Sequence, residues 1–216
     1  MTQSAEGLKS FTHLLETIAD NKYVFGDKLV EIGFSGPNLE ATLAAVAMAQ
    51  GELGHARLMY NWVFDLKGYK GKKPDIKSQT GKAFQRVTGV YNWISLIASL
   101  YAVNTAVDLV LKSILEADHS KVAGRVQKLL REQKEHIMYS RGWASELLND
   151  RGAVPRKFKE ELNQVVPQVE SWLQSIEQKT ELVQEGYIIP QSNLLHKFKE
   201  EMKTLAAGEE RSVGSV

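Results

Sequence analysis

The sequence predicts an all-α fold: a four-helix bundle in two antiparallel hairpins, with one or two additional C-terminal helices. Apolar residues recur at spacings of three and four along almost the whole chain, which is the periodicity of helices buried on one side. The alternating pattern of half-buried strands is nearly missing from the sequence. Short turn signals divide the chain into long segments, and short connections favour antiparallel neighbours.

The composition is that of a globular domain with a sizeable core. Of 216 residues, 43% are hydrophobic and 25% are charged, and the formal net charge is +1. This charge gives no global reason to expect nucleic-acid or membrane binding. Cysteine is absent, which excludes disulfides, thiolate metal sites and thiol nucleophiles. Residues 1–10 lack the basic start and apolar run of a secretory signal, so we expect a cytoplasmic protein.

The first hairpin is expected over residues 7–66. Its first helix runs to Gly33, after which Ser35, Gly36 and Pro37 stop one helix and allow another to begin. The second helix covers about residues 38–66. A polar stretch rich in Gly and Lys follows over residues 67–90, and we expect it to form a long loop.

The second hairpin is expected to comprise helices over about residues 92–117 and 122–149. The most apolar segment of the chain, residues 94–115, lies in the first of these helices. Asn104 and Asp108 interrupt this segment, which argues against a membrane span.

The C-terminal part is expected to pack beside the bundle. Pro155 suits the first turn of a fifth helix, which we expect to be bent or interrupted at Pro167. A last helix is expected over about residues 192–206. The domain is therefore predicted to span residues 1–207, with a disordered tail over residues 208–216.

Two helical motifs carry the candidate chemistry. Glu52 and His55 form an E-x-x-H motif on the second helix, and Gln133 and His136 repeat its spacing on the fourth helix with an amide replacing the carboxylate. Ferritin-like bundles hold two iron ions with two E-x-x-H motifs and one acid from each of the other two helices. The sequence therefore predicts a ferritin-like bundle whose ligand positions are partly neutralised.

The other two ligand positions follow from helix geometry. Antiparallel helices place residues that are equally distant from a turn at the same level, so Asn21 should lie opposite the first motif and Asn104 opposite the second. The four acid positions are then Asn21, Glu52, Asn104 and Gln133. Amides carry no charge and are poor ligands for hard cations, but they can hydrogen-bond to the two histidines. We therefore expect a metal-free polar network, the relict of a di-iron site.

Neighbouring acids leave a metal site open as an alternative. Asp108 lies one turn from Asn104, and Glu132 lies one turn from His136 and faces inward by helical angle. A shifted iron site would comprise Glu52, His55, Asp108, Glu132 and His136. The alternatives to the metal-free network are thus a single weakly bound metal and a complete di-iron centre.

Several segments resemble the ferritin-like subunits of bacterial phenylacetyl-CoA epoxidase, also called ring-1,2-phenylacetyl-CoA oxygenase. The resemblance extends over about residues 20–202 and is looser in the 67–90 loop. Its most specific piece is Ser-Arg-Gly-Trp at residues 140–143. The matching segments are Asp20-Asn21, Gly36-Pro37-x-Leu39-Glu40, Glu52-Leu53-Gly54-His55-Ala56-Arg57, Tyr139-Ser140-Arg141-Gly142-Trp143, and Leu182-Val183-Gln184-Glu185-Gly186 with Pro190.

The resemblance implies one of two homologous subunit types. One type carries the di-iron centre and binds the CoA thioester, and the other has lost most ligands and pairs with the first as a structural partner. Glu52, His55 and His136 match ligands of the catalytic type, whereas Asn104 and Gln133 depart from its aspartate and glutamate. The beginning of the matching region and the fourth helix look more like the structural, C-type member of the pair.

We therefore expect an accessory subunit of a multicomponent phenylacetyl-CoA epoxidase in aerobic phenylacetate catabolism, with no cofactor retained. Its expected partner is the catalytic homologue or a second copy of itself, with a CoA thioester near the shared interface. One alternative is a catalytic di-iron monooxygenase subunit acting on an aromatic CoA thioester. The other is a homo-oligomeric ferritin-like protein that binds iron. We expect no nucleic acid and no membrane among its partners.

The basic loop has two interpretations. It is either an ordinary solvated loop or an electrostatic landing surface for an acidic partner subunit or the phosphates of CoA. Asp75 is the acid among its basic residues, which are Lys67, Lys70, Lys72, Lys73, Lys77, Lys82 and Arg86.

Overall fold

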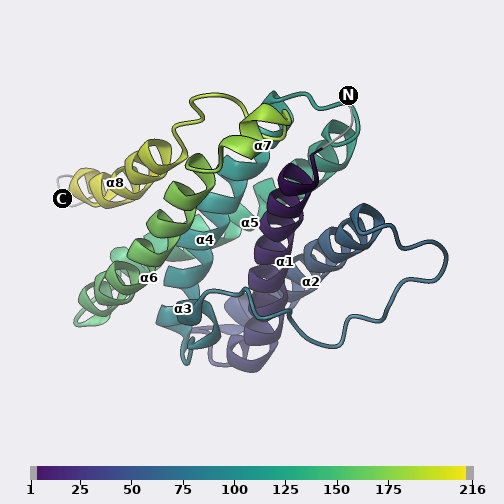
Figure 1. The fold of residues 1–216 in the computed structure, drawn as a ribbon. Helices are drawn as coiled ribbons and strands as arrows, with labels where there is room; N and C mark the ends of the chain where they lie inside the picture. The colour runs from purple at the N-terminus through teal and green to yellow at the C-terminus, as the bar shows by residue number, and fades with distance from the viewer. Residues whose placement is uncertain (1–3, 213–216) are drawn as a thin grey trace.

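The computed structural model describes residues 4–212, with side chains through Leu205, and its regular structure in this range is helical, without strands. The all-α prediction is confirmed. The helices of the described chain are α1 (Ala5–Gly33), α2 (Leu39–Leu66), α3 (Gln85–Thr88), α4 (Trp93–Glu116), α5 (Ala123–Leu148), α6 (Val154–Glu177), α7 (Thr180–Gln184) and α8 (Leu194–Ser212). Figure 1 shows the antiparallel pair α1–α2 beside the α4, α5 and α6 group.

The first hairpin is held by helix caps and by a close approach of its two helices. The Ser4 side chain caps α1 by accepting a hydrogen bond from the Gly7 amide, and Asn38 caps α2 in the same way. A Cβ at Gly26 would lie 2.4 Å from Cγ of Leu53, so only glycine allows α1 to approach α2 this closely there. The spacing between α1 and α2 therefore depends on this small residue.

The central helix is α4, which contacts α1, α5, α6 and α8. A capping box of Asn92 and Ser95 starts this helix. By length and hydropathy α4 could cross a membrane, but 89% of its most apolar window is buried inside the fold. Its apolar character is thus accounted for by its position in the core.

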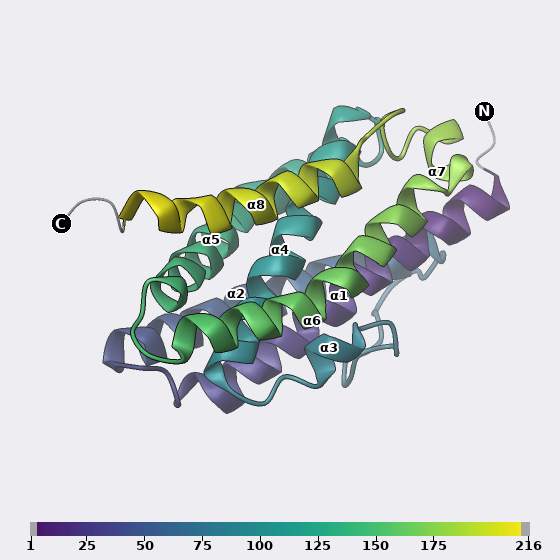
Figure 2. The same cartoon turned by 90° about the vertical axis from the view of Figure 1, so that its left-hand side faces the viewer.

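The C-terminal helices cover one side of the bundle. α6 packs against α4 and α5, and α8 lies along α4, α5 and α6 (Figure 2). The short helix α7 packs against α1. These helices leave the outer side of α2 uncovered by any described helix, because α2 contacts α1 extensively and α5 more sparsely.

The predicted interruption at Pro167 and the predicted end of the last helix differ from the structure, whereas the alternative of a bend at Pro167 stays a prediction. α6 runs through Pro167 without interruption, because Val165 and Val169 on either side of the proline are buried and hold both halves in place. The last helix extends to Ser212 instead of ending near residue 206. Residues 213–216 of the predicted tail lie outside the described residues.

The predicted 67–90 loop contains the short helix α3, and the rest of it is irregular. Figure 1 shows the loop swinging out beyond the end of α2 and returning across α1 to α3. The return is fixed by Asp20, whose buried carboxylate accepts hydrogen bonds from Thr80 N (2.9 Å), Thr80 Oγ1 (2.9 Å) and Lys82 N (2.6 Å), and from the hydroxyl of Tyr60. One carboxylate on α1 therefore anchors the returning loop.

Candidate functional site: a lysine-centred polar core

The middle of the bundle contains a fully buried lysine. Lys22 is on α1, and its Nζ lies 2.9 Å from Glu52 Oε2 on α2 and 3.0 Å from Asn104 Oδ1 on α4. The same nitrogen lies 3.3 Å from His136 Nδ1 on α5. Each bundle helix thus supplies one side chain to a single centre.

Glu52 is the acceptor at this centre. Its Oε1 receives hydrogen bonds from Asn104 Nδ2 and from His136 Nδ1, each at 2.8 Å. Since a carboxylate only accepts, His136 carries a proton on Nδ1, and its approach to the Lys22 ammonium is a contact without a hydrogen bond. Both oxygens of the buried carboxylate are therefore satisfied.

The charges of Lys22 and Glu52 depend on each other. Burial would raise the pKa of Glu52, but the charges and hydrogen bonds of Lys22 and His136 outweigh it and hold that pKa well below its usual range. Burial lowers the pKa of Lys22, against the opposing attraction of Glu52 and, more weakly, Asp108. The pair is an ammonium and a carboxylate, because their 2.9 Å contact is that of a charge-assisted hydrogen bond.

Gln133 completes the contact between the two hairpins. It is fully buried on α5, and its Nε2 donates to the backbone oxygen (3.1 Å) and to Oδ1 (3.3 Å) of Asn104. Its Oε1 has no hydrogen-bond partner. The amide at this position therefore supports Asn104, which in turn holds Glu52.

His55 lies beside the centre without joining it. Its ring stacks on that of His136 with centroids 4.4 Å apart, and its Nε2 donates to Glu132 Oε2 at 3.0 Å. Burial and the charges of Lys22 and His136 lower the pKa of His55 to about 2, against the opposing effects of Glu52 and Gln133. His55 is therefore neutral, and its buried Nδ1 has no hydrogen-bond partner.

The prediction for Asn21 is wrong. Asn21 is buried, but it faces the returning loop: its Oδ1 accepts from Phe84 N at 3.0 Å, and its Nδ2 donates to Thr17 O at 2.8 Å. One residue along a helix is a rotation of about 100°, so the neighbouring Lys22 faces the centre instead. Asn104 and Gln133, by contrast, both lie at the centre with Glu52.

Four residues of the predicted shifted iron site lie in one chain of contacts, which runs from Glu52 through His136 and His55 to Glu132, whereas the fifth, Asp108, is engaged elsewhere. Asp108 is paired with Lys112 at 2.6 Å, and Glu132 is half exposed. Among the described residues, no group of three or more His, Asp or Glu side chains is arranged to hold a metal ion.

A di-iron centre does not fit these residues. Glu52 is the single carboxylate at the centre, and it is already neutralised by the ammonium of Lys22. Two iron ions would need several more acids to offset their charge.

The sequence contains a signal for Lys22 that is separate from the two E-x-x-H-type motifs. Lys22 continues the apolar stripe of α1, since it follows Ile18 by four residues and precedes Phe25 by three. A lysine in the middle of a buried stripe needs an acid partner, and Glu52 is the acid predicted at the same level of the bundle. Position on the apolar stripe, used together with the level along the helix, would have selected Lys22 over Asn21.

Comparisons with known proteins agree with the resemblance found in the sequence. A family model described as "phenylacetic acid catabolic protein" matches residues 1–210. The C subunit of 1,2-phenylacetyl-CoA epoxidase from Escherichia coli (strain K12) is 23% identical over 152 residues, which are 68% of this chain and 61% of that protein. The match thus covers less than two thirds of the relative's length.

Proposed function

Because the chain belongs to the phenylacetic acid catabolic protein family, we propose that it is an accessory subunit of a multicomponent phenylacetyl-CoA epoxidase in phenylacetate catabolism. The similar Escherichia coli protein is named as the C subunit of such an enzyme, which supports the accessory role. In this role the chain stabilises a homologous subunit that performs the chemistry, and it works in the cytoplasm.

The observation that carries this proposal is the ammonium of Lys22 at the centre of the bundle. One ammonium and one carboxylate cancel, and the surrounding amides and His55 are neutral. With the positive charge of His136 added, the centre has no negative charge in excess and offers no free carboxylate to further cations. Oxygen activation then belongs to the partner subunit.

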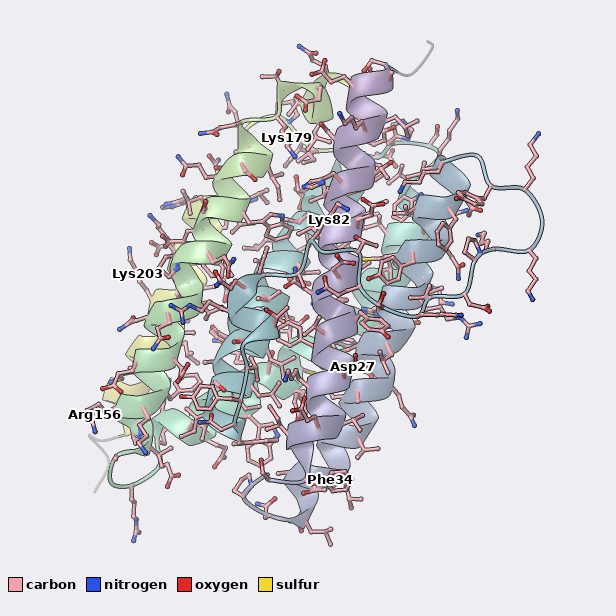
Figure 3. All side chains as sticks on the ribbon, turned by 60° about the horizontal axis from the view of Figure 1, so that its bottom comes forward. Asp27, Phe34, Lys82, Arg156, Lys179 and Lys203 are labelled. Atoms are coloured by element: carbon pink, nitrogen blue, oxygen red, sulfur yellow. The ribbon has the colours of Figure 1, made fainter. Side chains whose placement is uncertain are left out.

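The outer side of the first hairpin supports an interaction with another subunit. It exposes Leu39 (69%), Leu43 (62%) and Phe34 (74%), together with Val30 and Val46. Figure 3 shows Phe34 at the turn between α1 and α2. An apolar helix face of this kind is typical of a protein interface. We propose that the catalytic homologue docks here, with a second copy of the chain as the alternative occupant.

A pocket beside the basic loop supports a role in binding the CoA thioester. The pocket has a volume of about 640 Å³ and lies between α1, α2 and residues 71–76. Arg57 and Lys72 bring positive charge to it, and Tyr23 and Leu53 bring apolar surface. We propose that phosphates of CoA bound to the complex interact with these basic side chains.

The accessory role is tested by reconstituting the complex with the chain present, absent or altered at its centre. We expect the chain to be required for epoxidation, and Glu52→Gln to leave the turnover per assembled complex unchanged. Glu31→Gln, at an exposed position of α1, is the matched control. Loss of turnover in fully assembled Glu52→Gln complexes, together with about two iron ions bound per chain, would establish the catalytic alternative.

A further inference from the structure

We infer that the Lys22 ammonium is a resident cation in the place of a metal ion, and that Glu52, Asn104 and His136 would bind one divalent cation if that ammonium were replaced by a carboxylate. This inference rests on the proposed function in one respect, that the native centre is not a redox site. It adds a physical reason why the native centre does not bind a metal ion, and it names a substitution that would allow one to bind.

The geometry around Lys22 Nζ is that of a coordination shell. Glu52 Oε2, Asn104 Oδ1 and His136 Nδ1 come from three helices and lie 2.9, 3.0 and 3.3 Å from one point. Carboxylate oxygen, amide oxygen and imidazole nitrogen are all metal ligands, and inward shifts of about 1 Å would bring them to bonding distances. His136 would bind through Nδ1 after its proton moves to Nε2.

Neighbouring hydrogen bonds already hold these atoms in position. Asn104 Nδ2 donates to Glu52 Oε1, and Gln133 Nε2 donates to Asn104. The His136 ring packs against Gly51, where a Cβ would lie 2.9 Å from Nε2. Outer hydrogen bonds and packing of this kind orient ligands at metal sites.

Charge explains why the native chain holds lysine and not metal. A divalent cation beside the ammonium and a single carboxylate would leave a buried net charge of about +2, which is strongly unfavourable. Asp108 and Glu132, the other acids near the centre, are engaged with Lys112 and His55. Lys22→Glu removes the ammonium and adds the second carboxylate that a divalent cation needs.

The test compares the full-length chain with Lys22→Glu, with and without Co²⁺, by thermal unfolding and visible absorption. Without metal, two buried carboxylates repel each other, so the variant should unfold at a lower temperature than the native chain. Saturating Co²⁺ should raise its unfolding temperature by roughly 5–10 °C and produce a Co²⁺ absorption band. The native chain and Lys9→Glu, at an exposed position of the same helix, should show neither response.

Lys22→Ala provides a second variant that removes the ammonium without adding an acid. It should bind Co²⁺ more weakly than Lys22→Glu, because one carboxylate is missing. Recovery of folded Lys22→Glu only in the presence of Co²⁺ would also support the inference. Stoichiometric Co²⁺ binding by the native chain would overturn it, as would folded or refolded Lys22 variants that never respond to Co²⁺. Either result leaves the accessory role standing if the chain is still required for epoxidation.

Discussion

At the scale of single residues, the polar core works because donors meet acceptors across all four bundle helices. Lys22 and Asn104 donate to Glu52, and Gln133 donates to Asn104. Each of these side chains is buried, so a partner that is removed cannot be replaced by bulk water. The stability of the bundle should therefore depend on each member.

Gln133→Leu tests this dependence. The leucine fills the space of the amide but leaves the oxygens of Asn104 without one of their donors, so we expect the free energy of unfolding to fall by about 1–3 kcal/mol. Urea denaturation of both chains measures the difference. Gln127→Leu, at an exposed position of α5, should have little effect, and equal stabilities of all three chains would contradict the network.

The neutral state of His55 makes stability dependent on pH. Its folded pKa is lowered to about 2, whereas its unfolded pKa is about 6.5, so the unfolded chain binds the proton more readily below pH 6.5. Stability should therefore fall as the pH drops from 7 to 5, by up to about 2 kcal/mol from this residue.

The contribution of His55 is separated from other groups by substitution. Denaturation curves at pH 7, 6 and 5 should be flatter for His55→Gln than for the native chain. His196→Gln, at an exposed position of α8, should keep the native slope. The opposite sign, with stability rising toward pH 5, would mean that His55 is protonated in the folded chain. The carboxyl of Glu52 begins to contribute only below about pH 4.5, outside this window.

At the scale of elements, α1 organises two different structures from adjacent positions. Asp20 and Asn21 bind the returning part of the 67–90 loop, and Lys22 binds the centre of the bundle. Burial and the hydrogen bond to Asp20 also raise the pKa of Tyr60, which fixes the hydroxyl of that residue as a donor. One turn of helix thus determines both the loop path and the core.

Asp20→Asn should release the loop while the helices persist. An amide loses the charge that strengthens the bonds to Thr80 and Lys82, each worth about 1.5–3 kcal/mol. We expect the amide hydrogens of Thr80 and Lys82 to exchange at least about tenfold faster, since about 1.4 kcal/mol gives a factor of ten. Asp75→Asn, in the exposed part of the loop, is the control; unchanged exchange in Asp20→Asn would remove the anchoring role.

The elements could be predicted well from the sequence, and the side chains of the centre only in part. Bundle helices start and end within two residues of their expected bounds, because caps and apolar periodicity are local signals. Asn21 was assigned to the centre by its level along α1, but level does not fix the direction of a side chain. The direction is set by the apolar stripe, and that stripe contains Lys22.

At the scale of the whole molecule, the family match confirms the resemblance that the motifs predicted. The motifs are enough to identify the family, because they are distributed over both hairpins. The proposed accessory role rests on the sum of charges around Glu52, and this sum could be taken only after Lys22 had been located in the structure. The exposed apolar face of the first hairpin could be identified only from the structure. Apolar residues occur on both sides of α2, so the sequence pattern alone does not tell which side is buried.

Leu43→Glu tests that face as a docking surface. A carboxylate buried in an apolar interface is unfavourable by several kcal/mol, so we expect binding to the catalytic subunit to weaken by more than about tenfold. Co-purification and titration measure the effect. Thr204→Glu, at an exposed position of α8 away from α2, adds the same charge elsewhere. Full assembly of Leu43→Glu complexes would locate the interface on another face.

The shared turn of α1 limits how the sequence can change by insertion or deletion. Removing or adding one residue just before Asp20 would rotate the segment by about 100° relative to the preceding turns. The ammonium would then point away from Glu52, and the carboxylate would lose Thr80 and Lys82 in the same event. Insertions and deletions are therefore permitted in the exposed loop. In this part of α1, by contrast, they would disrupt both the polar core and the attachment of the returning loop.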